Sequence, residues 1–73
     1  MKKSIFTKDH IYLVNQLKKA RRVIGFKQVK AANLLGKSQS YISKIESGQR
    51  RLDIVQLKKF AKIYRKTLNY FIS

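Results

Sequence analysis

The sequence contains no cysteine and no proline, and only three of its 73 residues are acidic. Without cysteine, neither a disulfide framework nor a thiolate metal site can stabilise the chain. A site built from other ligands is not expected either, because His10 is the only histidine and the acids Asp9, Glu46 and Asp53 are scattered. We therefore expect no metal and no cofactor.

Long apolar runs are also missing. The longest is Ile11-Tyr12-Leu13-Val14, whereas a helix that crosses a bilayer needs about 20 apolar residues. The start Lys2-Lys3 is not followed by an apolar stretch with a small-residue cleavage site, so it does not resemble a secretory signal. These observations predict a cytoplasmic protein with no membrane partner.

What the chain has in excess is positive charge, with 18 lysines and arginines and a net charge of +15. A solvated surface would accept charge of either sign, so the near-exclusion of acids indicates a polyanionic partner, with nucleic acid as the first candidate. No nucleophile–base–acid set and no glycine-rich phosphate loop can be assembled. We therefore expect a binding protein that is not an enzyme and takes no small-molecule ligand.

The spacing of apolar residues predicts an all-α fold, a compact five-helix bundle containing a helix-turn-helix. Apolar side chains recur at three and four residues, and no alternating strand pattern is present. A chain this short allows one domain, which we place at residues 8–73, after a basic and frayed N-terminal arm over residues 1–7. The predicted helices cover residues 8–24, 28–35, 39–46, 54–64 and 68–72.

The predicted helix ends carry suitable capping residues. Gly25, Gly36 and Gly48 each follow a predicted helix, where a left-handed residue ends it without strain. Gln56, three residues after Asp53, completes a capping box. The residues suited to cap the helix starts are Thr7 or Asp9, Ser38, Asp53 and Thr67.

The helix predicted over residues 39–46 has one face for packing and one for contact. At about 100° per residue, Ile42 and Ile45 fall on the same side. Such a short helix would be marginal alone, so the rest of the chain must hold it. Its separation from helix 28–35 is that of a helix-turn-helix. The polar face carries Gln39 in the first turn, Ser40, Ser43 and Lys44.

From Gly25 to Arg51 the sequence follows the pattern Gly-Phe-x-Gln-x-x-x-Ala-x-x-Leu-Gly-x-Ser-Gln-Ser-Tyr-Ile-Ser-x-Ile-Glu-Ser-Gly-x-Arg-Arg. This pattern resembles the phage-repressor-like (Xre, or Cro-type) helix-turn-helix family, and the likeness extends from Leu17 to Ile72. The resemblance implies a sequence-specific regulator of transcription that binds double-stranded DNA, which we expect to be a repressor. It also implies that helix 39–46 lies in the major groove.

The resemblance implies a role for individual residues. Glutamine can pair with N6 and N7 of adenine, and lysine with O6 and N7 of guanine, so the polar face has suitable chemistry. The positions that match base-reading residues of the family are Gln39, Ser40, Ser43 and Lys44. The positions that match phosphate-binding residues are Gln28, Ser38, Ser47, Gln49, Arg50 and Arg51. Tyr41 flanks the apolar face, so it could pack, contact phosphate, or both.

Arg21 lies beside the apolar stripe of the first helix, where an arginine needs an acid. The resemblance implies that Arg21 and Glu46 form a partly buried ion pair that joins the first helix to the third. The chain departs from the family at Arg65, where a helix-ending glycine is common, and at Lys66, where an apolar residue is common. A left-handed residue other than glycine costs about 1 kcal/mol, so the end of the fourth helix is expected to differ from the family.

Three alternatives stay open. The chain could be the DNA-binding subunit of an antitoxin or phage-switch pair that acts with a separate partner. It could bind RNA by charge, although Tyr12 and Tyr70 are the only good candidates for exposed stacking aromatics. It could also form a homodimer on DNA, in which Tyr70, Phe71 and Ile72 either make the contact or complete the core.

Overall fold

The computed structural model describes residues 8–72, which contain five helices and no strand. The helices are α1 (Lys8–Ile24), α2 (Gln28–Leu35), α3 (Gln39–Glu46), α4 (Ile54–Tyr64) and α5 (Leu68–Ile72). These bounds confirm the all-α prediction and its helix limits. The predicted basic arm of residues 1–7, including the proposed cap Thr7, lies outside the described residues.

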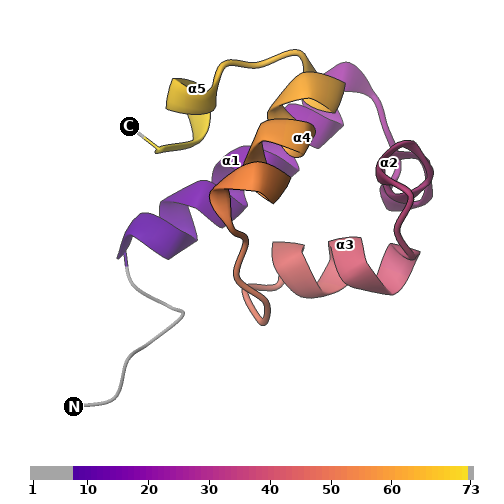
Figure 1. Ribbon diagram of the computed structural model, residues 1–73, viewed down its shortest axis with the longest axis horizontal. Helices are drawn as coiled ribbons and strands as arrows, with labels where there is room; N and C mark the ends of the chain where they lie inside the picture. Colours follow the sequence, from indigo (N-terminus) through magenta and orange to yellow (C-terminus); the bar gives the residue numbers. More distant parts are fainter. Residues whose placement is uncertain (1–7, 73) are drawn as a thin grey trace.

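Helix α1 is the element against which the others are assembled. It packs against α3, α4 and α5, while α2 packs against α3 and α4. Figure 1 shows α4 crossing in front of α1, with α3 along the lower edge of the molecule and α2 seen end-on beside it. The two helices of the helix-turn-helix are thus held in place by α1, which packs on α3, and by α4, which packs on α2.

The core is formed by the apolar faces that the periodicity predicted. Leu17 of α1, Phe60 and Tyr64 of α4 and Phe71 of α5 are almost completely buried. On α2 the buried residues are Ala31 and Ala32, and their small side chains let α3 and α4 approach closely. Because Phe71 is fully buried, α5 completes the core.

Helices α3 and α4 begin with the side-chain caps that the sequence predicted. The hydroxyl of Ser38 accepts a hydrogen bond from the Tyr41 amide at 3.2 Å, and the carboxylate of Asp53 accepts one from the Gln56 amide at 2.8 Å. Asp9 is not a cap, because α1 begins at Lys8 and Asp9 lies inside its first turn. There its charge is favourable to the positive end of the helix dipole.

Helix α4 is capped at Arg65, where the family commonly has a glycine. Arg65 adopts φ 59° and ψ 44°, the left-handed conformation that Gly36 adopts after α2. The residue after each of these two donates the same hydrogen bond back into its helix. Lys37 N–H donates to the Ala32 carbonyl of α2, and Lys66 N–H donates to the Ala61 carbonyl of α4, each at 2.9 Å. The departure at Arg65 therefore leaves the type of helix end unchanged and adds backbone strain.

No helix within residues 8–72 is long and apolar enough to cross a membrane. The same residues contain no group of three or more side chains placed to hold a metal ion.

Candidate nucleic-acid interface

Helix α3 presents its polar face to solvent. Ile42 is 0% exposed and Ile45 1% exposed, and both belong to the core cluster. The four residues expected to read bases are all exposed on the opposite face: Gln39, Ser40, Ser43 and Lys44. The fold thus brings these four side chains together on a free helix surface.

The residues expected to bind phosphate flank this face at both ends of α3. Ser38 is exposed at its start, and Gln28 is half-buried at the start of α2. Beyond the end of α3, a loop carries exposed Ser47, Gln49, Arg50 and Arg51. The Ser47 hydroxyl donates to the Lys44 carbonyl at 3.1 Å, so it must rotate before it can donate to a phosphate.

Arg21 and Glu46 form an ion pair between α1 and α3. Arg21 Nε donates to Glu46 Oε2 at 2.7 Å, and Nη2 donates to Oε1 at 2.9 Å. The third donor, Nη1, binds the Phe26 carbonyl at 2.9 Å. The side chains are only 12% and 6% exposed, and the hydrogen bond to Glu46 raises the pKa of Arg21. This two-point contact fixes the end of α3 to α1.

The hydrogen bonds continue from the ion pair to the surface. Gln28 Nε2 donates to Glu46 Oε1 at 3.1 Å, and Gln39 Nε2 donates to Gln28 Oε1 at 3.0 Å. An unbroken chain therefore runs from Arg21 through Glu46 and Gln28 to Gln39. The resemblance predicted a phosphate contact for Gln28, and this contact between the two glutamine side chains was missed.

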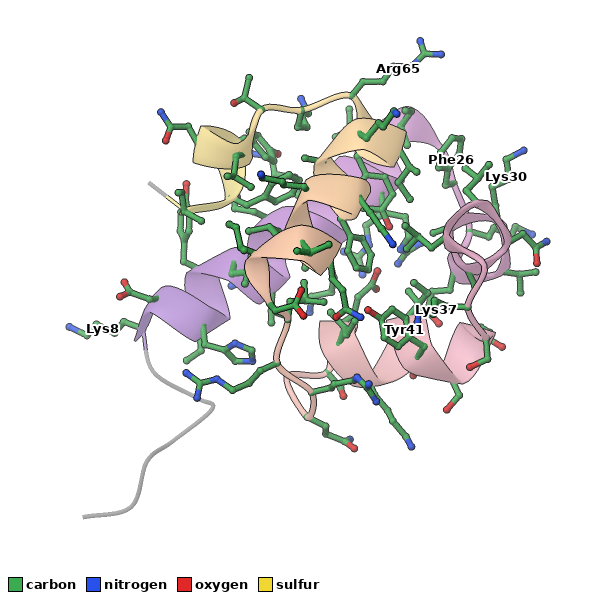
Figure 2. All side chains as sticks on the ribbon, viewed as in Figure 1. Lys8, Phe26, Lys30, Lys37, Tyr41 and Arg65 are labelled. Atoms are coloured by element: carbon green, nitrogen blue, oxygen red, sulfur yellow. The ribbon has the colours of Figure 1, made fainter. Side chains whose placement is uncertain are left out.

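Tyr41 packs and also holds two cations. Its ring stacks on Phe60 with centroids 6.4 Å apart, while Lys37 Nζ lies 5.2 Å and Arg50 Cζ 5.1 Å from its centroid. Burial raises the pKa of the Tyr41 hydroxyl. Figure 2 shows Lys37 and Tyr41 together beside α3. Sequence reasoning missed Lys37, for which its place in the turn between two helices was the available signal.

The exposed charges between Lys37 and Arg51 are all positive. Glu46 is the only acid between Ser38 and Arg51, and it is buried against Arg21 and not displayed. Lys37, Lys44, Arg50 and Arg51 are exposed around it. A face that combines exposed polar side chains with cations is suited to a nucleic-acid duplex.

A family model described as helix-turn-helix matches residues 17–71. The chain belongs to this family. The match confirms the resemblance seen between Gly25 and Arg51, and the chain is a DNA-binding regulator of the helix-turn-helix type. A comparison with curated proteins gave no match.

Solved structures of two regulatory proteins superpose well on the chain. The restriction-modification controller protein C.AhdI from Aeromonas hydrophila has a TM-score of 0.78 at 26% identity, over 85% of this chain and 90% of that one. An HTH_3 family transcriptional regulator from Vibrio cholerae has a TM-score of 0.75 at 30% identity, and the match covers 82% of this chain but 34% of the regulator.

A third match is to an enzyme. Hydroxypropylphosphonic acid epoxidase from S. wedmorenis has a TM-score of 0.80 at 20% identity, and the match covers 86% of this chain and 34% of the epoxidase. At this identity the likeness shows the fold alone. The same helical fold is thus found as one part of a longer enzyme.

Proposed function

We propose that the chain recognises a specific DNA sequence by placing α3 in the major groove, and that it represses transcription by occupying an operator. The observation that carries this proposal is the hydrogen-bond chain that ends at exposed Gln39. It supports a reading role because a glutamine held in one orientation can present its amide to N6 and N7 of adenine. We assign Ser40, Ser43 and Lys44 to neighbouring base edges.

Binding of the DNA backbone is assigned to the residues around α3. Ser38 and Gln28 are proposed to bind a phosphate at the start of the helix, and Arg50 and Arg51 a phosphate beyond its end. Ser47 and Gln49 are proposed to contribute from the same loop. The two cations on the Tyr41 ring support this assignment, because the ring holds Lys37 and Arg50 at the same edge of the surface.

Occupancy of an operator needs no catalytic group, and we propose that the chain has no enzymatic activity. The likeness to a controller protein over 90% of that chain supports a regulatory role for a unit of this size. The likeness to the epoxidase concerns fold only and supports no reaction.

A homodimer on DNA would place two copies of α3 about one helical turn apart. Of the three residues expected at its interface, Phe71 is buried in the core, Tyr70 is half-buried and Ile72 is 56% exposed. We propose that a dimer contact would use Ile72 and exposed Tyr12, which line the same shallow pocket. Sedimentation of the wild type and of Ile72→Ser, each bound to a duplex selected from a random pool, tests this. A single copy of the wild type per selected duplex would contradict it.

The deciding experiment is selection of bound sequences from a random duplex pool, followed by titration of the selected duplex, a scrambled duplex and an RNA hairpin of equal length. We expect a consensus that is bound about a thousandfold more tightly than the scrambled duplex at equal salt. Equal affinity for all three nucleic acids would favour the charge-driven RNA binder instead.

A further inference from the structure

A groove lies between α2 and α4, and the proposed DNA-binding role does not explain it. Its volume is about 700 Å³, and its apolar floor is formed by Phe26, Leu34, Leu35 and Ile63. Leu34 is 49% exposed, while the other three are half-buried. The helices that build this groove are therefore packed, but its floor remains open to solvent.

Cations surround this floor on both walls. Lys30 stands on the α2 side, and Lys59, Lys62 and Arg65 stand on the α4 side. None of the acids within residues 8–72 lines the groove. Lys30 Nζ lies 5.7 Å from the centroid of the Phe26 ring, which keeps this charge at the edge of the apolar floor. Four like charges are thus held together without a counter-charge, and they would attract a partner of opposite sign.

The groove adjoins one edge of the DNA-binding surface, because Leu35 and Lys59 of the groove also line a small pocket with Lys37 and Tyr41. In the view of Figure 2, Lys30 and Arg65 project upward, whereas Lys37 and Tyr41 lie with α3 at the lower side. The polar face of α3 contributes no residue to the groove. A ligand in the groove would therefore leave the polar face of α3 uncovered.

We propose that the groove between α2 and α4 binds an acidic amphipathic helix of a partner protein. Apolar side chains of that helix, three and four residues apart, would cover Leu34, Leu35 and Ile63. Carboxylates on its two flanks would meet Lys30 on one wall and Lys59 and Lys62 on the other. The charges match an acidic partner. The apolar floor favours a peptide over a nucleic acid, because phosphates cannot cover an exposed leucine side chain.

The proposal is tested with the full chain, in the absence of DNA. The probe is a synthetic blocked peptide of about five helical turns, with leucine at helical spacing and glutamate at the other positions. The control peptide has the same composition in an order that gives no apolar face. Binding is followed by fluorescence anisotropy, and the contact surface is located from amide shifts of the labelled protein.

Two pairs of variants distinguish binding in the groove from non-specific binding by charge or by apolar surface. Lys62→Glu should weaken peptide binding about tenfold, whereas Lys19→Glu makes the same charge change on α1, outside the groove, and should alter it less than about twofold. Leu34→Gln should weaken binding about fivefold. Val23→Gln, which changes a 70% exposed side chain on α1, is its control. All four positions are exposed, so the variants should fold, which circular dichroism checks.

Amide shifts confined to α2 and α4, together with loss of binding in Lys62→Glu and Leu34→Gln, would support the proposal. Equal binding of the two peptides, equal effects of groove and control variants, or no binding at millimolar peptide would overturn it. A titration with duplex DNA completes the test. The groove is a phosphate site, and the peptide proposal is wrong, if the duplex shifts the amides of the groove and Lys62→Glu weakens duplex binding much more than Lys19→Glu does.

Discussion

Gln39 is bound to the protein through its side-chain amide while its position on α3 leaves it exposed to a partner. If it reads a base, Gln39→Ala should weaken the selected site by about 1 to 3 kcal/mol and weaken unrelated DNA much less. Arg51→Ala should instead weaken all duplexes about equally and reduce the salt slope by about one unit, because a phosphate carries no sequence. Titration of both variants on the selected and the scrambled duplex measures the difference. An equal loss on both duplexes for Gln39→Ala would remove α3 as the reading helix.

The ion pair of Arg21 and Glu46 makes a strong prediction about stability. Because both side chains are largely buried, Glu46→Ala leaves the guanidinium without its partner and should lower the free energy of unfolding by about 3 kcal/mol. Denaturant melts of Glu46→Ala, Arg21→Ala and the double variant give the coupling energy. A coupling near zero would mean that the pair adds nothing beyond its separate side chains.

The Tyr64 hydroxyl is a polar group inside the apolar core. It is buried and has no hydrogen-bond partner among residues 8–72, and burial raises the pKa of this hydroxyl. Removing an unpartnered group should be neutral or stabilising, so we expect Tyr64→Phe to raise the free energy of unfolding at pH 7 by up to about 1 kcal/mol.

The raised pKa of Tyr64 also gives this prediction a pH dependence. The unfolded tyrosine releases its proton near pH 10, while the folded one keeps it to higher pH. The unfolded state therefore binds fewer protons above about pH 10, and stability falls as pH rises. Tyr64→Phe lacks this loss, so its advantage over wild type should grow between pH 7 and about pH 11. Urea melts at both pH values measure it, and an advantage that shrinks would contradict the prediction.

At the scale of the element, the left-handed end of α4 predicts a stabilising substitution. Arg65 is the only non-glycine residue with positive φ among the described residues. Arg65→Gly should relieve the strain and stabilise the protein by about 1 kcal/mol. Arg65→Ala removes the side chain but keeps the strain, so it is the control and should not stabilise. Thermal melts distinguish the two, and equal effects would assign the change to lost charge.

The helices could be predicted from sequence because their limits are determined by local residues. Ser38 and Asp53 cap helix starts, and Gly36 and Gly48 follow helix ends, so each boundary depends on a few neighbouring residues. The polar face of α3 followed in the same way from the spacing of Ile42 and Ile45. Local rules did not account for Arg65, which adopts the left-handed conformation although it is not a glycine.

The parts of the site that sequence did not predict depend on how helices meet in space. Gln28 and Gln39 open different helices, and only the close packing of α2 on α3 brings their side chains to 3.0 Å. Lys37 and Arg50 lie before and after α3, yet both lie over the ring of Tyr41. No periodicity within a single helix contains this information, so the shared ring becomes visible only when the helices are assembled.

At the scale of the whole molecule, the net charge of +15 predicts measurable binding to any duplex. Each phosphate neutralised should contribute about −0.9 to the slope of log K against log salt. Titration of a scrambled duplex at several salt concentrations measures this slope. A nearly flat response would mean that the cations lie too far from the backbone to account for binding.

The scarcity of acids also matters when the chain is alone. Folding gathers the cations into a body with a radius of gyration of 11.6 Å, whereas an unfolded chain of this length would spread them over about 26 Å. The folded state therefore carries more self-repulsion than the unfolded one, and dissolved ions reduce it. Salt consequently has opposite effects on the two equilibria, since it strengthens the free fold and weakens the complex. On DNA, the phosphates take the place of the dissolved anions, so the duplex itself reduces the repulsion between the cations of the folded chain.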